Sequence, residues 1–572
     1  MSSGNLTDVE RIKAESRHLR GTILESLADP LTGALAADDT QLSKFHGFYQ
    51  QDDRDIRSER TRQRLEPAFS FMIRARVPAG ICTSEQWLNM DSIARRFANG
   101  TIRLTTRQAI QLHGVIKSNL KDTIRGINDK MMDTLAACGD VNRNVMAPTL
   151  FDLSSVHREV QAQAAALSAH LTPATRAYHE IWLDGEKIES SEAEEEPIYG
   201  STYLPRKFKS AFVVPPQNDV DVYSQDLGFI AIIESGRLAG YNIVVGGGMG
   251  MSHGEPDTYP RLAEPLGFCG PDELVRLAEA VVTTQRDFGD RTNRKHARLK
   301  YTIDDRGIDW FRDQVKQRSG ISLGDPRPFV FAGNGDVYGW QKDDAGFWHY
   351  TLFIENGRVT DCGDRKLMSG LRAIAGQHTG DFRLTPNQNL SISNVADRDK
   401  TAIDTLLRDY GIENSVRASA LRLHSMACVA LPSCALAMAE SERYLPSLID
   451  KLDAALAGAG LADDAITIRM TGCPNGCARP YIAEIGLVGK GPGRYNLYLG
   501  AGFSGDRLGC LYRDNADETE ILDALSPLFD RYADERQEDE RFGDFLVRTG
   551  VVREVSEGRF FHAAAAVEIA SA

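Results

Sequence analysis

The stretch TIRLTTRQAIQLHG, residues 101–114, has a second copy in DFRLTPNQNLSISN, residues 381–394. Aligned without gaps, the two copies match Arg103 to Arg383, Leu104 to Leu384, Thr105 to Thr385 and Gln108 to Gln388. A strand-like segment followed by a helical one precedes each copy, at 69–99 and at 349–376. Chance similarity over so short a window is the alternative, but the repeated strand–helix–strand order favours an internal duplication.

A duplicated strand–helix unit predicts an α+β fold with pseudo-two-fold symmetry, and a cleft between its halves would suit a large cofactor. The chain has 572 residues, too many for one hydrophobic core, so several domains are expected. No apolar run approaches the roughly 20 residues that span a bilayer, and the charged N-terminus lacks an apolar signal core. We therefore expect a cytoplasmic protein with no membrane partner.

The formal net charge of −14 argues against nucleic acid as a general partner, because phosphate binding requires a basic face. An anionic ligand could still occupy a locally basic pocket. The glycine run at 246–250 does not form the G-x-G-x-x-G pattern of a dinucleotide site. We interpret it as a turn or a backbone surface that a ligand approaches, and we expect no flavin or NADPH site in this chain.

Four of the nine cysteines are grouped in two pairs. Cys428 and Cys434 have five residues between them, and Cys473 and Cys477 enclose the turn Pro-Asn-Gly. Four thiolates in two short-range pairs could bind zinc or an iron–sulfur cluster. Zinc sites favour the C-x2-C spacing, which neither pair has, so the spacing favours a cluster. Buried structural cysteines are the third reading, and we adopt that reading for the five single cysteines.

The two cysteine motifs closely resemble those of the sulfite and nitrite reductase family. The similarity extends over nearly the whole chain, through the motifs FHGFYQQDDRDIR, RLTTRQAIQLHG, NRNV, TYLPRKFK, VVPPQND, VVTTQRDFG and GLVGKGPGRYN. Within the family, the chain most resembles the haem-bearing subunits of NADPH-dependent sulfite reductases. The resemblance implies a duplicated, pseudo-two-fold α+β fold of three domains around a central sirohaem and [4Fe–4S] centre.

The resemblance also implies the activity: six-electron reduction of sulfite to sulfide for sulfur assimilation, with electrons from NADPH through a separate flavoprotein subunit in a hetero-oligomer. The alternative within the family is a ferredoxin-dependent sulfite or nitrite reductase. A different class of alternative is a non-enzymatic iron–sulfur or zinc protein. The implied domains are 1–65, an N-terminal extension that could dock the flavoprotein; 66–140 with 338–414, the duplicated ferredoxin-like domain; 141–337, a sirohaem- and substrate-binding domain; and 415–572, a cluster- and sirohaem-binding domain.

By the same resemblance, Cys428, Cys434, Cys473 and Cys477 ligate the cluster, and Cys477 is also the proximal sirohaem ligand. The residues implied for sulfite binding are Arg74, Arg143, Lys207 and Lys209. Sulfite is a small dianion, so forked arginine donors and proton-carrying lysines suit it. On spacing alone, Arg74 reads as a solvated strand charge, and Lys207 and Lys209 share one face of a β-like segment.

Sirohaem carries many carboxylates, so its pocket must be locally basic. The candidates for binding it are Arg103, Arg107, Gln111, His113, Asn387, Asn389 and Cys477, and further candidates are Arg294, Lys295, Arg298 and Lys300. We interpret His113 as a hydrogen-bonding or core residue rather than an iron ligand. The chain departs from the family pattern in ARPYIAEIGLVG, after Cys477, and in NRNVMAP, which lacks an expected cysteine. Neither departure removes a proposed ligand.

Overall fold

The computed structural model describes residues 6–149, 154–174, 182–183, 186–187, 196–413 and 418–563. The predicted duplication is present as two five-stranded sheets with the same arrangement. The first sheet runs β1 (Phe48–Asp52), β2 (Phe69–Ala75), β5 (Ile110–Val115), β4 (Ile102–Leu104) and β14 (Arg358–Val359). The second runs β12 (Gly339–Lys342), β13 (Trp348–Leu352), β18 (Leu390–Val395), β17 (Asp381–Leu384) and β3 (Ile81–Thr83).

Each half contributes its short third strand to the sheet of the other half. β3 pairs with β17 of the second sheet, and β14 pairs with β4 of the first. The crossing points are tight, because Gly80 and Gly357 have φ values of +75° and +74°. A Cβ at Gly80 would lie 2.5 Å from the carbonyl oxygen of Leu384, and one at Gly357 would lie 2.3 Å from that of Leu104. The exchange locks the two halves together as one body with a shared core.

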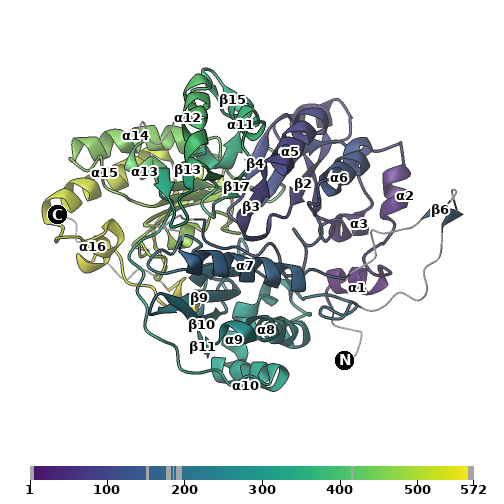
Figure 1. The fold of residues 1–572 in the computed structure, drawn as a ribbon, viewed down its shortest axis with the longest axis horizontal. Helices are drawn as coiled ribbons and strands as arrows, with labels where there is room; N and C mark the ends of the chain where they lie inside the picture. Colours follow the sequence, from purple (N-terminus) through teal and green to yellow (C-terminus); the bar gives the residue numbers. More distant parts are fainter. Residues whose placement is uncertain are drawn as a thin grey trace.

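Equivalent helices cover the two sheets (Figure 1). They are α5 (Ser84–Phe97) and α6 (Leu120–Asn128) in the first half, and α11 (Leu367–Ala375) and α12 (Lys400–Asp409) in the second. The start of α5 follows from a capping box: the Thr83 hydroxyl accepts from the Gln86 amide N–H, and the Gln86 side chain accepts from the Thr83 N–H. Its apolar face buries Trp87, which stacks on Phe382 of the second half at 5.2 Å.

The middle of the chain forms a separate sheet with helices. Its strands, in spatial order, are β11 (Glu264–Cys269), β10 (Arg237–Val245), β9 (Leu227–Glu234) and β8 (Ser210–Val213). The accompanying helices, in the lower part of Figure 1, are α7 (Ser155–His170), α8 (Leu274–Phe288), α9 (Leu299–Arg306) and α10 (Ile308–Ser319).

The C-terminal part has a mixed sheet of β19 (Ser425–Ala427), β20 (Ile468–Thr471), β21 (Ile485–Gly491), β22 (Arg494–Leu499) and β23 (Cys510–Ala516). Its first three strands are parallel, and the rest pair antiparallel. The helices that accompany it are α14 (Leu445–Gly458), α15 (Glu518–Glu535) and α16 (Phe542–Arg548).

The N-terminal residues pack onto the body of the protein. Helices α1 (Asp8–Glu15), α2 (Ile23–Ala28) and α3 (Ala37–Leu42) precede β1, which belongs to the first sheet. Ile12 and Leu42 are buried in the core that also contains the middle sheet. The structure therefore corrects the predicted extension over 1–65: its last third includes a strand of the duplicated domain. The predicted boundary at 414/415 lies outside the described residues.

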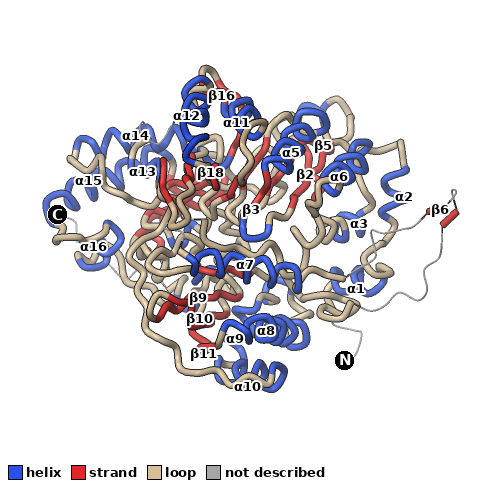
Figure 2. The backbone as a smooth tube through the Cα atoms, viewed as in Figure 1, coloured by secondary structure: helices blue, strands red, loops and turns tan. Residues whose placement is uncertain are grey.

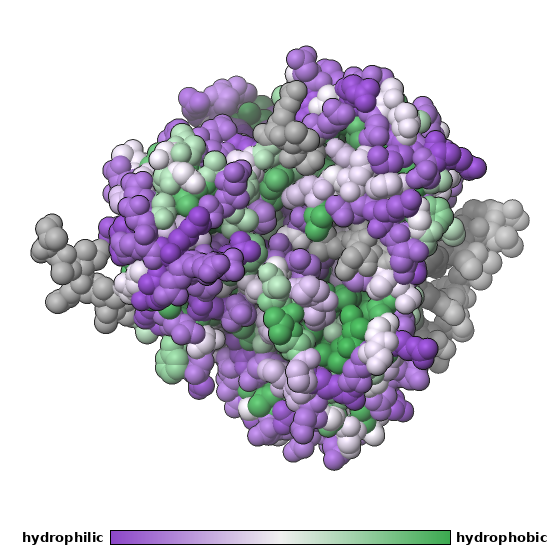
Figure 3. Space-filling model, turned by 60° about the vertical axis from the view of Figure 1, so that its left-hand side comes forward, coloured by the Kyte–Doolittle hydropathy of each residue, from purple (hydrophilic) through white to green (hydrophobic). Residues whose placement is uncertain are grey.

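The tube view shows the sheets gathered at the centre with helices around them (Figure 2). One face of the molecule is dominated by hydrophilic residues, with smaller hydrophobic areas between them (Figure 3). Among the described helices, none is long and apolar enough to cross a bilayer.

Candidate active site

The two cysteine pairs meet because they follow neighbouring parallel strands. Cys428 comes directly after β19, and Cys473 comes two residues after β20, its partner in the sheet. In open α/β sheets, ligand sites form beyond the carboxyl ends of parallel strands. Strand pairing thus brings together two motifs that are separated by about forty residues of sequence.

All four clustered cysteines line one cavity of about 420 Å³. The same cavity is lined by residues of both repeats and of the middle of the chain. Of the residues predicted for the site, it is lined by Arg74, Arg103, Gln111, His113, Arg143, Lys207, Cys428, Cys434, Cys473 and Cys477. Most of the residues predicted for the site therefore line one pocket, at which three parts of the chain meet.

The thiols are close enough to influence one another's protonation. Burial, together with neighbouring thiols, raises the pKa of Cys428 to about 12, that of Cys434 to about 11 and that of Cys473 to about 12. In the absence of a metal these thiols are neutral at physiological pH. Thiolates are the metal-binding form, so binding must release protons.

Donors around the thiols would support bound sulfur. The Gly472 N–H donates to Cys428 Sγ at 3.3 Å, and the Asn475 amide donates to Cys473 Sγ at 3.6 Å. Arg54 donates to the carbonyl oxygen of Cys434 at 3.1 Å, which fixes that loop from outside. Among the described residues, no group of three or more His, Cys, Asp and Glu side chains has the arrangement of a single-ion metal site.

Arg74 and Arg143 lie on the cavity wall near Tyr49, which also lines the cavity, and Cys138, which contacts Arg74. Arg74 Nη1 donates to Cys138 Sγ at 2.9 Å, and Arg143 Nη2 donates to the carbonyl oxygen of Gly139 at 3.1 Å. Burial, reinforced by the neighbouring Cys138, raises the pKa of Tyr49 to about 12. Cys138, predicted to be a plain buried residue, is buried but contacts a predicted substrate-binding arginine.

The two predicted lysines differ in their position. Lys207 lines the cavity, whereas Lys209 lies just before β8 and does not belong to the lining that the described residues form. Burial, with Arg206 and Arg143 nearby, lowers the pKa of Lys207 to about 7. Burial and the adjacent Lys207 lower the pKa of Lys209 well below its ordinary value. Each ammonium therefore gains strongly from a nearby anion.

The cavity is basic although the protein is acidic overall. The cationic residues lining it are Lys44, Arg74, Arg103, Arg143, Arg206, Lys207 and Arg294. Among the described lining residues, Asp140 is the one carboxylate, and it pairs with Arg294 at 2.8 Å. This excess of positive charge favours a polyanionic ligand.

The implied cofactor fits these residues. His113 is 4% exposed, and neither of its ring nitrogens has a hydrogen-bond partner. Buried polar atoms without partners are rare, so a ligand that reaches His113 would satisfy them. Arg103 is partly committed: it donates to Glu442 at 2.8 Å and to the carbonyl oxygen of Ala427 at 2.9 Å. A sirohaem with its carboxylates toward the cationic wall matches the charge and donor pattern of the cavity.

Three of the predicted sirohaem-binding residues have other partners. Arg107 donates to the carbonyl oxygen of Asn144 at 2.6 Å and to Gln225 at 2.8 Å. Asn387 and Asn389 donate to Asp336 at 2.9 and 2.7 Å. None of the three belongs to the lining that the described residues form. The role of these three residues in binding sirohaem therefore stays a prediction.

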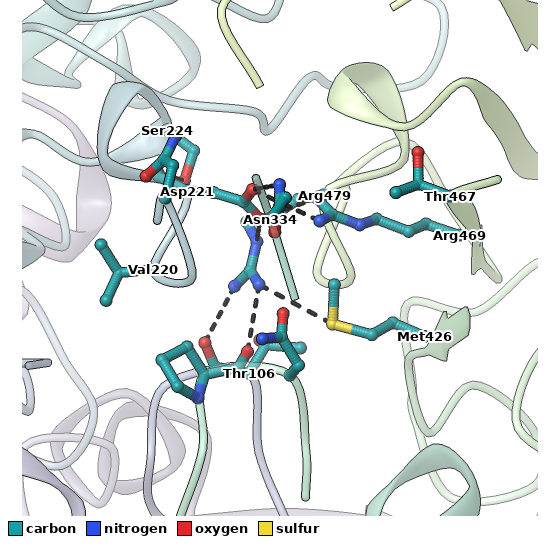
Figure 4. A network of polar contacts seen from close by, with 12 residues as sticks. Thr106, Val220, Asp221, Ser224, Asn334, Met426, Thr467, Arg469 and Arg479 are labelled. Carbon is teal, nitrogen blue, oxygen red and sulfur yellow. Dashed lines mark hydrogen bonds and ion pairs between the residues drawn. The ribbon is translucent and has the colours of Figure 1, made fainter. Parts of the chain in front are cut away.

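A buried ion-pair network includes Arg479, which lies two residues after Cys477 in the chain (Figure 4). Asp221 accepts from Arg469 at 2.7 Å, from Arg479, and from Asn334 at 2.9 Å. The sequence offered one signal for this network, the arginine two residues after Cys477, but none for its partners.

Comparison with known proteins agrees with this geometry. The model of the nitrite and sulphite reductase 4Fe-4S domain matches residues 163–323, and that of the nitrite/sulfite reductase ferredoxin-like half domain matches 63–130 and 341–410. The four clustered cysteines lie outside these ranges. The duplication predicted from sequence is thus confirmed by two matches to one half-domain model.

Relatives cover nearly the whole chain. Proteins named "Sulfite reductase [NADPH] hemoprotein beta-component" from Geobacillus kaustophilus and Staphylococcus saprophyticus are each 58% identical to it, with 98% of both chains covered. The solved structure of the Mycobacterium tuberculosis NirA protein has a TM-score of 0.75 at 25% identity and covers 95% of this chain and 96% of its own. The chain therefore belongs to the nitrite and sulfite reductase family.

Proposed function

We propose that this chain is the haem-bearing subunit of an assimilatory sulfite reductase. The observation that carries the proposal is the single cavity that brings four thiols together with a wall of anion-binding cations. The reaction consumes six electrons and seven protons: SO₃²⁻ + 6e⁻ + 7H⁺ → HS⁻ + 3H₂O. Sirohaem coupled to a [4Fe–4S] cluster, when bound, supplies a metal site for sulfur and a relay for electrons.

Cys428, Cys434, Cys473 and Cys477 would hold the cluster, with Cys477 also serving as the proximal sirohaem ligand. Cys477 suits this double role because it is the exposed member of the four and lines the cavity. The other three thiols are partly or fully buried, where water is excluded from a bound cluster.

Arg74, Arg143, Lys207 and Lys209 would hold sulfite and supply protons. The two arginines stay charged and give fixed donors to oxyanion oxygens. Lys207 can exchange a proton near neutral pH, because its pKa lies at about 7. Gln111, His113 and Arg103 would orient the sirohaem carboxylates.

The electron donor would be a separate flavoprotein subunit, as the word "NADPH" in the relatives' name suggests. We propose residues 1–65 as its docking site. Arg54 links this segment to the loop that carries Cys434, because its side chain donates to the carbonyl oxygens of Cys434 and Ala437 at 3.1 and 2.5 Å.

Turnover of sulfite and of nitrite with an artificial electron donor tests the reaction. We expect a higher kcat/KM for sulfite, because the doubly charged anion gains more from the cationic wall. The matched variants are Arg143→Lys, which loses the fork but keeps the charge, and Arg96→Lys, on the exposed side of α5. Preference for nitrite by the wild type, or equal activity of both variants, would contradict the proposal.

A further inference from the structure

We infer that Arg479 is a positioning residue that fixes the loop carrying Cys473 and Cys477 against both repeats of the duplicated fold. The inference rests on the proposed function, because it takes the two thiols of that loop as cluster ligands. Arg479 is 4% exposed and does not belong to the cavity lining that the described residues form. It therefore acts through the loop rather than by touching a ligand.

The guanidinium of Arg479 contacts equivalent residues of the two repeats. Its Nη1 donates to the carbonyl oxygen of Thr106 at 2.9 Å, and its Nη2 donates to that of Pro386 at 3.0 Å. Thr106 and Pro386 are equivalent residues: each is the sixth of its aligned copy, 101–114 and 381–394. One side chain thus holds the same turn of both repeats; Figure 4 labels Arg479 and Thr106 of this contact.

The remaining nitrogen of the fork is held by the middle of the chain. Arg479 Nε donates to Asp221, which is fully buried and lies between β8 and β9. Nη2 also contacts Met426 Sδ at 3.7 Å, two residues before Cys428. Arg479 therefore joins the loop to both repeats, to the middle domain and to the strand that leads to the first cysteine pair.

The backbone of the loop is shaped for this contact. Arg479 has φ +57° and ψ +48°, and Asp221 has φ +49° and ψ +61°, the left-handed region that residues with a Cβ disfavour. Such conformations persist where surrounding contacts hold them, and they are common at functional sites. The loop has a further contact with the first repeat, because the Thr106 hydroxyl donates to the carbonyl oxygen of Cys477 at 3.1 Å.

A matched pair of variants separates positioning from charge neutralisation. Arg479→Lys and Arg469→Lys both keep a cation beside Asp221. Only Arg479→Lys loses the fork that reaches Thr106 and Pro386, because Arg469 binds the same carboxylate from β20. Arg479→Gly removes the side chain at a backbone conformation that glycine adopts freely, so the variant introduces no backbone strain.

The readouts are acid-labile sulfide per chain and hydrogen exchange of the peptide 471–480 in the full chain. For Arg479→Lys and Arg479→Gly we expect exchange about tenfold faster than in Arg469→Lys. We also expect the affinity for the cluster to fall about tenfold, as when residues that orient metal ligands are changed. In partly loaded protein, kcat should fall in proportion to labile sulfide while KM for sulfite stays unchanged.

Equal exchange and equal labile sulfide in the two lysine variants would overturn the inference and leave the proposed function intact. A wild-type chain without labile sulfide would overturn the proposed function, while the exchange comparison would still test the positioning of the loop. If both Arg479 variants fail to fold, Asp221→Asn decides the question. It removes the negative charge that holds Arg479 Nε, and unchanged exchange at 471–480 would then overturn the inference.

Discussion

Replacing Asp221 by Asn perturbs a buried ion-pair network. Asp221 is fully buried, and its partners Arg469 and Arg479 are 2% and 4% exposed. Burial opposes the charge of Asp221, but Arg469 and Arg479 lower its pKa below the ordinary value. In the variant, both arginines would keep their charges in a site without a counterion.

The expected loss follows from the burial of the network. Removing one partner of a buried ion pair costs about 3–5 kcal/mol, whereas an exposed pair contributes about 0.2–1 kcal/mol. Asparagine keeps the size of the side chain and one acceptor oxygen, so we take the lower end, about 3 kcal/mol. With a urea slope of about 3 kcal/mol/M, the unfolding midpoint should fall by about 1 M.

Urea unfolding of the full chain at neutral pH, followed by circular dichroism, measures this shift. The control is Glu518→Gln, which removes the exposed pair with Lys451 and should move the midpoint by less than about 0.3 M. Because the folded pKa of Asp221 lies below 3.8, the network contributes fully above that pH and is lost as pH falls further. A shift in Asp221→Asn no larger than in the control would refute the reasoning.

Three further predictions concern the cavity. Cys477→Ser should lose labile sulfide, because a hydroxyl is a poor ligand for soft iron. The control is Cys362→Ser, at an exposed cysteine outside the cavity lining, which should bind as much cluster as the wild type. Equal labile sulfide in the two variants would contradict the ligand assignment. Lys209→Met should lower sulfite turnover about 100-fold while keeping cofactor loading; wild-type turnover would exclude a catalytic role. Since the pKa of Lys207 is about 7, KM for sulfite should rise as pH rises through that value. Lys207→Arg is permanently charged and should abolish this rise in KM. Identical pH profiles of KM in the wild type and the variant would contradict a charged Lys207 in sulfite binding.

The duplicated fold could be predicted because each repeat carries its pattern locally. The segment 101–114 and its copy contain strand, turn and strand in one short window, and helix α5 has its capping box at Thr83 and Gln86. The exchange of β3 and β14 could not be predicted. Each is only three or two residues long, and its partner lies in the other repeat, several hundred residues away in the case of β3 and β17.

Site residues could be predicted where their spacing or motif indicates their chemistry, as in the two cysteine pairs. Hydrogen-bond and ion-pair partners that are distant in sequence could not be predicted. The hydrogen bonds of Asn387 and Asn389 to Asp336, about fifty residues earlier, could not be predicted. Likewise, Asp221 and Arg479 are 258 residues apart, and no local pattern joins them. These residues pair because folding buries them side by side, and only the folded chain shows which residues are buried together.

The central claim is that the four cysteines and the basic cavity hold a coupled sirohaem and iron–sulfur centre. A visible absorption spectrum combined with iron and acid-labile sulfide analysis of the purified chain tests it most directly. The account predicts sirohaem bands with about four labile sulfides per haem. A colourless, zinc-containing protein, after expression with adequate sirohaem and iron, would contradict it.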